Sequence, residues 1–142
     1  EHLVLDMNGT LTLDGNLIKG VTERINGLAK VMNIHVLTAD TFGTAETVFR
    51  DLPIQLEIIA EENQAVRKWK YLQQLGPERT AAIGNGMNDH LMLGDAVLGI
   101  AVTGYEGLAG TALAAANIIA PSIESALDLL LYPARLIATL RN

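Results

Sequence analysis

The segment His2-Leu3-Val4-Leu5-Asp6-Met7-Asn8-Gly9-Thr10 joins an apolar run to a polar turn. Apolar runs without polar alternation are typical of strands that are buried on both faces of a parallel sheet. This run ends at Asp6, and Gly9 allows the backbone to turn sharply just after it. The segment therefore predicts a buried strand with a carboxylate at its carboxyl end.

Five further apolar runs follow, with longer stretches of helical spacing between them. The expected strands cover Asn33–Leu37, Ile54–Ala60, Thr80–Ile83, Ala96–Val102 and Asn117–Ala120. Alternation of strands and helices along the whole chain predicts an α/β fold with a parallel sheet and right-handed crossovers. Leu11–Ile18 is an exception, because its Asp14-Gly15 pair predicts a small hairpin directly after the first strand.

The expected helices carry apolar residues at every third or fourth position. They cover residues 21–31, Thr41–Leu52, Asn63–Leu75 and Gly107–Ala116. Gly76 stops the third of them, and Asn88 is placed to cap another helix. A last, Leu-rich helix begins at Ser122 and is interrupted at Pro133. We expect one domain over residues 1–142.

Charge and composition exclude several classes of protein. The 142 residues include 10 Lys and Arg against 16 Asp and Glu, which gives a formal net charge of −6. Nucleic acids and anionic membrane surfaces attract clustered basic residues, so neither is an expected partner. The chain has no cysteine, which excludes disulfides and zinc–thiolate sites. Asp6 stands where the apolar part of a signal peptide would begin, so we expect a cytoplasmic protein.

Polar residues gather where the expected strands end, which is where ligands bind in open α/β sheets. Asp6 is a candidate nucleophile, and together with Asp89 it could hold Mg²⁺. Gly9 could aim backbone N–H groups at an anion, and Thr38 could donate a hydroxyl at a helix start. Each of these residues, taken singly, also suits an ordinary turn or a helix cap.

Spacing and order add to this evidence, because three segments resemble motifs of the haloacid dehalogenase (HAD) superfamily. They are Leu3–Thr12 for the first motif, Val36–Asp40 for the second and Ile83–Asp89 for the fourth. The chain resembles most the phosphorylation domain of P-type ATPases, as a small soluble relative of that domain. The resemblance implies a Rossmann-like core, with the hairpin as a flap and no cap domain.

The same resemblance implies a set of site residues. The catalytic residues would be Asp6 as nucleophile, with Asn8 and Lys68. Phosphate would be bound by Gly9, Thr10, Thr38 and Ala39. The Mg²⁺ ligands would be Asp6, Asn8, Asn85 and Asp89.

Three positions depart from the pattern of the superfamily's phosphatases. Asn8 replaces the carboxyl that acts as general acid and base, and Asn85 replaces a charged metal ligand. The third-motif lysine falls on Gln64, whereas Lys68 lies one helical turn further along the same face. General acid–base help is worth about 10²- to 10⁴-fold, so we expect slow turnover.

Two functions remain open at this point. The first is a Mg²⁺-dependent phosphatase that forms an aspartyl-phosphate on Asp6. The second is a catalytically degenerate protein that binds a phosphorylated small molecule or a phosphoprotein. The C-terminal leucines exceed what a small sheet can bury, so we also expect self-association through this region. Those residues are Leu127, Leu130, Leu131, Leu136 and Ile137.

Overall fold

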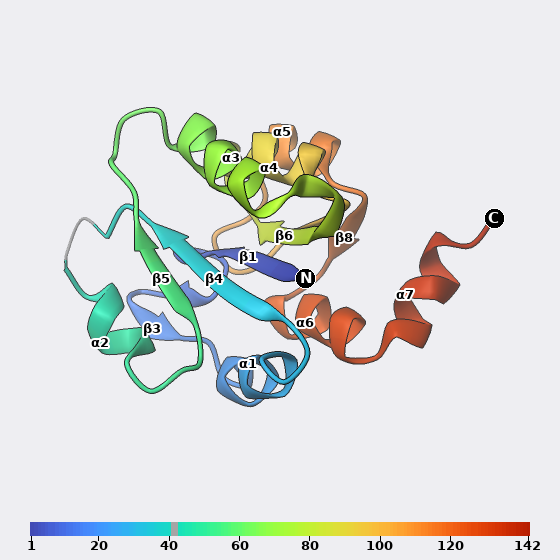
Figure 1. Cartoon of the computed structure of the whole chain (residues 1–142), viewed down its shortest axis with the longest axis horizontal. Helices are drawn as coiled ribbons and strands as arrows, with labels where there is room; N and C mark the ends of the chain where they lie inside the picture. The colour runs from blue at the N-terminus through green and yellow to red at the C-terminus, as the bar shows by residue number, and fades with distance from the viewer. Residues whose placement is uncertain (41–42) are drawn as a thin grey trace.

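Six parallel strands form one sheet in the computed structural model, which describes residues 1–40 and 43–142. The strand order is β5-β4-β1-β6-β7-β8 (Figure 1). The strands are β1 (His2–Asp6), β4 (Asn33–Thr38), β5 (Gln55–Ile58), β6 (Thr80–Gly84), β7 (Leu98–Val102) and β8 (Ile118–Ala120). The predicted α/β fold with a parallel sheet of about six strands is confirmed.

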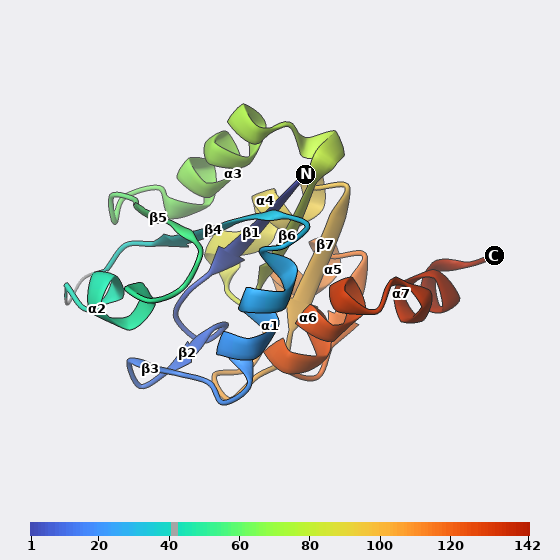
Figure 2. The same ribbon diagram turned by 60° about the horizontal axis from the view of Figure 1, so that its bottom comes forward.

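Helices cover both faces of the sheet (Figures 1 and 2). One face packs against α1 (Val21–Leu28), α2 (Ala45–Phe49) and α6 (Ile123–Leu131). The other packs against α3 (Gln64–Leu75), α4 (His90–Asp95) and α5 (Gly110–Ala115). Strand β1 serves both layers, since Leu3 and Leu5 enter the first core and Val4 enters the second. This explains why its apolar run shows no polar alternation.

A two-stranded hairpin follows β1, as the sequence predicts. It consists of β2 (Thr12–Leu13) and β3 (Asn16–Leu17), which pair antiparallel. The turn residues Asp14 and Gly15 have φ angles of 50° and 81°. Positive φ at both central positions is the requirement of a tight hairpin turn that matches the twist of the strands.

Several element boundaries differ from those predicted. The third strand is limited to β5, the fifth begins only at Leu98, and the helix expected over 107–116 is shortened to α5. Helix α2 begins at Ala45, and the predicted start of that helix at Thr41 falls outside the described residues. Ser122 caps α6 as expected, because its Oγ accepts a hydrogen bond from the amide of Ser125.

The prediction that Asn88 caps a helix is wrong. Asn88 lies inside a short 3₁₀ turn, η2 (Met87–Asp89), that precedes α4. Its side-chain nitrogen donates to Oε1 of Gln64 at 2.6 Å, which ties this turn to the start of α3. A second 3₁₀ turn, η1 (Pro77–Arg79), links α3 to β6.

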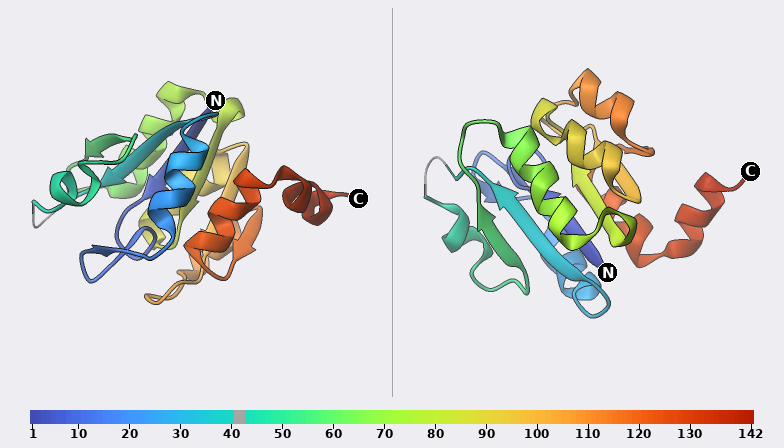
Figure 3. Two further views of the ribbon diagram at one scale, coloured as in Figure 1. Left: turned by 90° about the horizontal axis from the view of Figure 1, so that it is seen from below. Right: turned by 45° about the horizontal axis from the view of Figure 1, so that its top comes forward.

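The C-terminal helix α7 (Pro133–Leu140) projects away from the sheet in all the views of Figures 1 to 3. Pro133 starts this helix at its first turn, where a missing N–H costs nothing. Leu127 of α6 is fully buried, so it is unavailable for self-association, whereas Ile137 of α7 is 66% exposed.

Among the described residues, no helix combines the length and apolarity that crossing a membrane requires.

Candidate active site

The parallel register brings three strand ends together at one edge of the sheet. Asp6 pairs with Leu37, one residue before Thr38, and Leu5 pairs with Ile83, one residue before Gly84. Asp6 and the residue after β6, Asn85, are each 7% exposed, and Thr38 is 2% exposed. Residues far apart in the sequence therefore meet in one buried polar site.

Lys68 of α3 lies at the centre of this site. Its ammonium nitrogen is 2.5 Å from Oδ1 of Asp6 and 2.6 Å from Oδ1 of Asp89. The lysine side chain is 1% exposed, and Asp89 is fully buried. Gln64, the alternative for the third-motif lysine, binds Asn88 instead. A buried charge requires such partners, so the two carboxylates and the ammonium group must be considered together.

Burial raises the pKa of Asp6 to about 6, and the nearby Asp89 carboxylate adds to the increase. The charge of Lys68 and its hydrogen bond act in the opposite direction. For Lys68, burial lowers the pKa, but the attraction of Asp6 and Asp89 is stronger, so its pKa is raised overall. At neutral pH the site therefore holds an ionised Asp6 beside a charged lysine.

Thr10 connects Asp6 to Asn85. Its hydroxyl lies 3.0 Å from Oδ2 of Asp6 and 3.2 Å from Oδ1 of Asn85. One carboxylate oxygen and one amide oxygen thus lie on the same hydroxyl group and close to each other. Mg²⁺ prefers oxygen ligands and commonly takes only one or two carboxylates, with waters completing its shell. Asp6 and Asn85 fit such an ion.

Both carboxylate oxygens of Asp89 accept hydrogen bonds within the protein. Its Oδ1 accepts from Lys68, and its Oδ2 accepts from the backbone N–H groups of Asn85 and Gly86, at 3.0 and 2.8 Å. Asp89 thereby positions Lys68 and the turn after β6, and its role as a metal ligand stays a prediction. In the part of the chain that the structure describes, no group of three acidic or histidine side chains is arranged to hold a metal.

The side chain of Asn8 lies beside the start of the hairpin. Its Oδ1 lies 3.5 Å from the hydroxyl of Thr12, at the start of the hairpin. The amide of Asn8 cannot replace the proton donor that its position would hold in the superfamily's phosphatases. The side chain therefore lines the entrance of the site.

The backbone amides of Gly9 and Thr10 do not form the expected open anion nest. The N–H of Gly9 donates to the carbonyl of Thr12 at 3.0 Å, and that of Thr10 donates to Met7 at 3.3 Å. Gly9 adopts a φ of 77°, which closes the turn around the Met7 carbonyl. Phosphate contacts from the backbone must therefore come from other residues of this turn.

Thr38 lies at the site, but the start of α2 beside it is already occupied. The hydroxyl of Thr38 accepts from the N–H of Asp40 at 3.1 Å, so it keeps its own hydrogen to donate. The Asp40 carboxylate accepts from the N–H groups of Thr44 and Ala45. The helix start that was expected to attract phosphate is thus capped by Asp40. Ala39 is half-buried between these two residues.

A cavity of about 480 Å³ opens beside Asn8, and it contains a residue that the sequence interpretation missed. This residue is Glu106, from the loop between β7 and α5. The available indication was its position, since it follows the end of a buried strand. The cavity is lined by Asn8, Thr12, Asp14, Gly15, Thr44 and Glu106.

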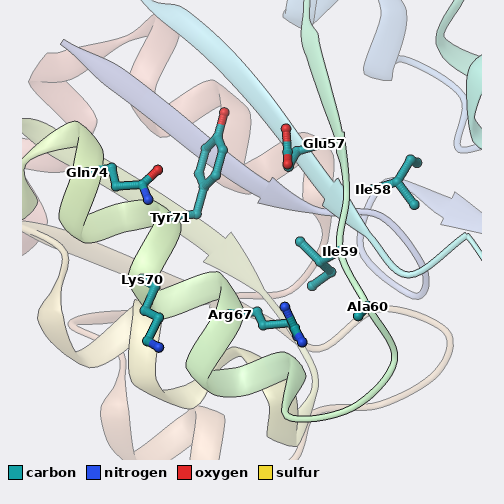
Figure 4. Close-up of a pocket in the computed structure, with 8 residues that line it drawn as sticks. All are labelled: Glu57, Ile58, Ile59, Ala60, Arg67, Lys70, Tyr71 and Gln74. Carbon is teal, nitrogen blue, oxygen red and sulfur yellow. The ribbon is translucent and has the colours of Figure 1, made fainter.

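A second cavity, of about 240 Å³, lies between β5 and α3. Figure 4 shows Arg67 directed toward Ile59 and Ala60, while Lys70 points away from the strand. Arg67 is also held by the carbonyl of Glu62 at 2.9 Å. None of the predicted site residues lines this cavity, so it is separate from the Asp6 site.

Two curated proteins of Methanocaldococcus jannaschii are similar in sequence. The uncharacterized protein MJ0073 is 42% identical over 84 residues, which are 56% of this chain and 90% of that protein. The uncharacterized protein MJ0072 is 44% identical over 39 residues, which are 28% of this chain and 89% of that protein. No protein-family model matches the chain.

Solved structures of HAD hydrolases share the fold. The cobalt-bound deoxy-D-mannose-octulosonate 8-phosphate phosphatase of Haemophilus influenzae has a TM-score of 0.74 at 15% identity, covering 99% of this chain and 92% of that one. The corresponding phosphatase of Moraxella catarrhalis, in complex with magnesium, phosphate and KDO, has a TM-score of 0.67 at 18% identity, covering 98% and 92%.

A zinc-transporting PIB-type ATPase has a TM-score of 0.66 at 22% identity, covering 87% of this chain but 20% of that one. The similarity to the ATPase is thus confined to one part of a much larger protein. Within residues 1–40 and 43–142, no separate domain interrupts the strand–helix alternation, as a cap would. The chain has the HAD fold without a cap in its described part, and it belongs to the same family as MJ0073.

Proposed function

We propose that this protein hydrolyses phosphate monoesters through a phosphorylated Asp6. The observation that carries the proposal is the contact of buried Lys68 with both Asp6 and Asp89. This arrangement keeps a carboxylate ionised at the end of β1 and places a fixed positive charge beside it. An aspartate used in this way is a nucleophile that divides phosphoryl transfer into two easier steps.

The residues of the site have separate tasks in this reaction. Asp6 attacks phosphorus, and Lys68 offsets the negative charge that the phosphoryl group brings into the buried site. The hydroxyl of Thr38 and the backbone of the Met7–Asn8 turn would bind phosphoryl oxygens. Mg²⁺ held by Asp6 and Asn85 would supply further neutralisation of that charge.

The substrate range and the rate follow from two different features of the site. Without a cap over the described residues, a small phosphorylated molecule or a phosphorylated protein segment could reach Asp6. The phosphatase names of the structural neighbours support the reaction class. Asn8 cannot donate a proton, and the neutral Asn85 binds Mg²⁺ more weakly than aspartate, so we propose slow turnover.

A phosphate-binding protein without catalysis is the second candidate. The two amides, Asn8 and Asn85, favour it, because each stands where a carboxylate would support hydrolysis. Both candidates predict binding of a phosphorylated ligand. Only the phosphatase predicts a covalent bond to Asp6.

Covalent trapping separates the two functions. The protein is incubated with Mg²⁺ and an aryl phosphate, quenched in acid and digested for mass spectrometry. We expect one phosphoryl group on the peptide that contains Asp6, no phosphoryl group with Asp6→Asn, and an unchanged result with the exposed control Asp51→Asn. Ligand binding without any phosphopeptide would reject the phosphatase and support the binding protein.

We also propose that the protein self-associates through α7. Ile137 and Leu140 are 66% and 48% exposed, and no residue of α7 is buried. A second copy would cover this apolar surface. Light scattering should show a mass above that of one chain, which Ile137→Glu reduces to the monomer; a monomeric wild type would contradict the proposal.

A further inference from the structure

The loop between β7 and α5 lies directly over the Gly9 turn. A Cβ atom on Gly104 would stand 3.2 Å from the Gly9 carbonyl oxygen, which shows how closely the two backbones approach. Asn85 holds the other end of the loop, since its Nδ2 donates to the Gly107 carbonyl at 3.1 Å and its own carbonyl accepts from Ala109 at 2.9 Å. The loop therefore keeps a fixed position beside the site.

This position directs the side chain of Glu106 toward Gly9. A Cβ atom on Gly9 would stand less than 3.0 Å from both Oε2 of Glu106 and Nδ2 of Asn85. Glu106 also lines the cavity that contains Asn8 and Thr12. A carboxylate from the β7–α5 loop thus lies against the Gly9 backbone, beside Asn8 and Asn85.

The two amides make this approach possible. Carboxylates at positions 8 and 85 would repel Glu106, whereas the neutral amides do not. Asn85 turns its nitrogen toward Glu106, while its oxygen faces Thr10 on the Asp6 side. Glu106 consequently lies near the Nδ2 group of Asn85 and lines the same cavity as Asn8, which lacks a carboxyl.

We propose that Glu106 is the general acid and base of this site. The proposal rests on the proposed phosphatase function. In the first step Asp6 forms a bond to phosphorus, the bond from phosphorus to the leaving oxygen breaks, and the Glu106 carboxyl gives its proton to that oxygen. In the second step the Glu106 carboxylate takes a proton from water, the resulting hydroxide bonds to phosphorus, and the bond from phosphorus to Asp6 breaks.

Glu106→Gln tests this assignment because it keeps the size of the side chain and removes the proton transfer. Single-turnover experiments follow formation and decay of phospho-Asp6 with an aryl and an alkyl phosphate. We expect decay to slow by about 10²- to 10⁴-fold with either substrate. Formation should slow strongly for the alkyl phosphate but little for the aryl phosphate, whose leaving group needs no proton.

Two further variants exclude a merely structural effect. Tyr105→Ala alters the neighbouring residue of the same loop, which is 82% exposed, and should leave both steps unchanged. Asn8→Asp, added to Glu106→Gln, supplies a carboxyl near the position of the removed Glu106 carboxyl. The double variant should regain at least a tenth of the wild-type rate of phospho-Asp6 decay. An effect shared by Tyr105→Ala, or absence of this rescue, would overturn the assignment.

The outcomes also separate this proposal from the proposed function. If wild-type protein forms phospho-Asp6 and Glu106→Gln forms and loses it at the same rates, Glu106 is not the acid and base, while the phosphatase function stands. If wild-type protein forms no phospho-Asp6, both proposals fail together.

Discussion

The ammonium nitrogen of Lys68 lies 2.5 Å from Oδ1 of Asp6, with the lysine side chain only 1% exposed. The same nitrogen contacts Asp89, so one cation is shared by two buried carboxylates. Removing a single partner from such a group leaves uncompensated charge, which costs far more than the group contributes when it is complete. The stability of the fold and the chemistry of the site are therefore linked through Lys68.

Lys68→Met should lower the free energy of unfolding by about 3 to 5 kcal/mol at pH 7, because Asp6 and Asp89 would face each other without a cation. The loss should be smaller at pH 5, where a carboxylate can take up a proton. Urea denaturation of the variant and the wild type at both pH values measures this loss of unfolding free energy. Lys70→Met, on the exposed side of the same helix, is the control and should change stability by less than about 0.5 kcal/mol. Equal effects of the two variants would contradict the prediction.

The fold and most of the strand ends could be predicted because buried parallel strands leave unbroken apolar runs. The burial of Lys68 was harder to predict, since the periodicity of α3 marks Val66, Trp69, Tyr71 and Leu72 as its apolar residues. The structure buries Leu72 as expected and Lys68 beside it, whereas Val66 is 39% exposed and Trp69 donates to Asp95. A lysine is buried only where carboxylates can pair with it, and here they come from β1 and from the turn after β6. The sequence of α3 alone does not reveal these partners.

Hydrogen bonds between the site residues were harder to predict than their positions. The sequence predicts Asp89 as a metal ligand but does not reveal that its oxygens also accept hydrogen bonds from backbone N–H groups and Lys68. The start of α2 was expected to bind phosphate, but Asp40 caps it. Glu106 was missed because its approach to Gly9 depends on the path of a loop rather than on a periodic pattern.

The Asp6 carboxyl should titrate at about pH 6 in metal-free protein, since burial and the Asp89 charge both raise its pKa. Between its ordinary pKa and about 6, the folded protein binds more protons at this group than the unfolded chain does. The resulting stabilisation is present at low pH and is lost as the pH rises through 6.

Carbon-13 NMR of the aspartate side chains measures this titration directly, with Asp6→Asn identifying the resonance. Formation of phospho-Asp6 should also decline below pH 6, because only the ionised carboxylate attacks phosphorus. A transition below pH 4 in the metal-free protein would show that Lys68 outweighs the effect of burial.

Gly84→Ala should disturb the site without altering any of its polar groups. A Cβ atom at Gly84 would stand 2.5 Å from Oδ2 of Asp89, whose side chain is fully buried and cannot move freely. Such overpacking costs about 1 to 3 kcal/mol and would displace the carboxylate that holds Lys68. Thermal unfolding and phospho-Asp6 formation should both be impaired. Gly110→Ala is the control, because open space surrounds that position; an equal loss in both variants would exclude the steric cause.

His35 on β4 gives the stability a second pH dependence. It is 2% exposed, and its ring nitrogens lie 3.0 Å from Nδ1 of His2 and 2.9 Å from the Tyr71 hydroxyl. Burial, aided by the charge of His2, lowers the pKa of His35 to about 4. Below its ordinary pKa of 6.5 the unfolded chain takes up a proton that the folded protein refuses, so stability falls as the pH decreases from 6.5 toward 4.

His35→Gln should remove this part of the pH dependence while retaining a side chain that can hydrogen-bond to Tyr71. Between pH 7.5 and pH 5 the wild type should lose about 2 kcal/mol more unfolding free energy than the variant. Urea denaturation at the two pH values measures the difference, and His90→Gln controls for the loss of an imidazole elsewhere. If His35→Gln loses as much stability as the wild type over this interval, the buried His35 is not the group that makes the fold sensitive to acid.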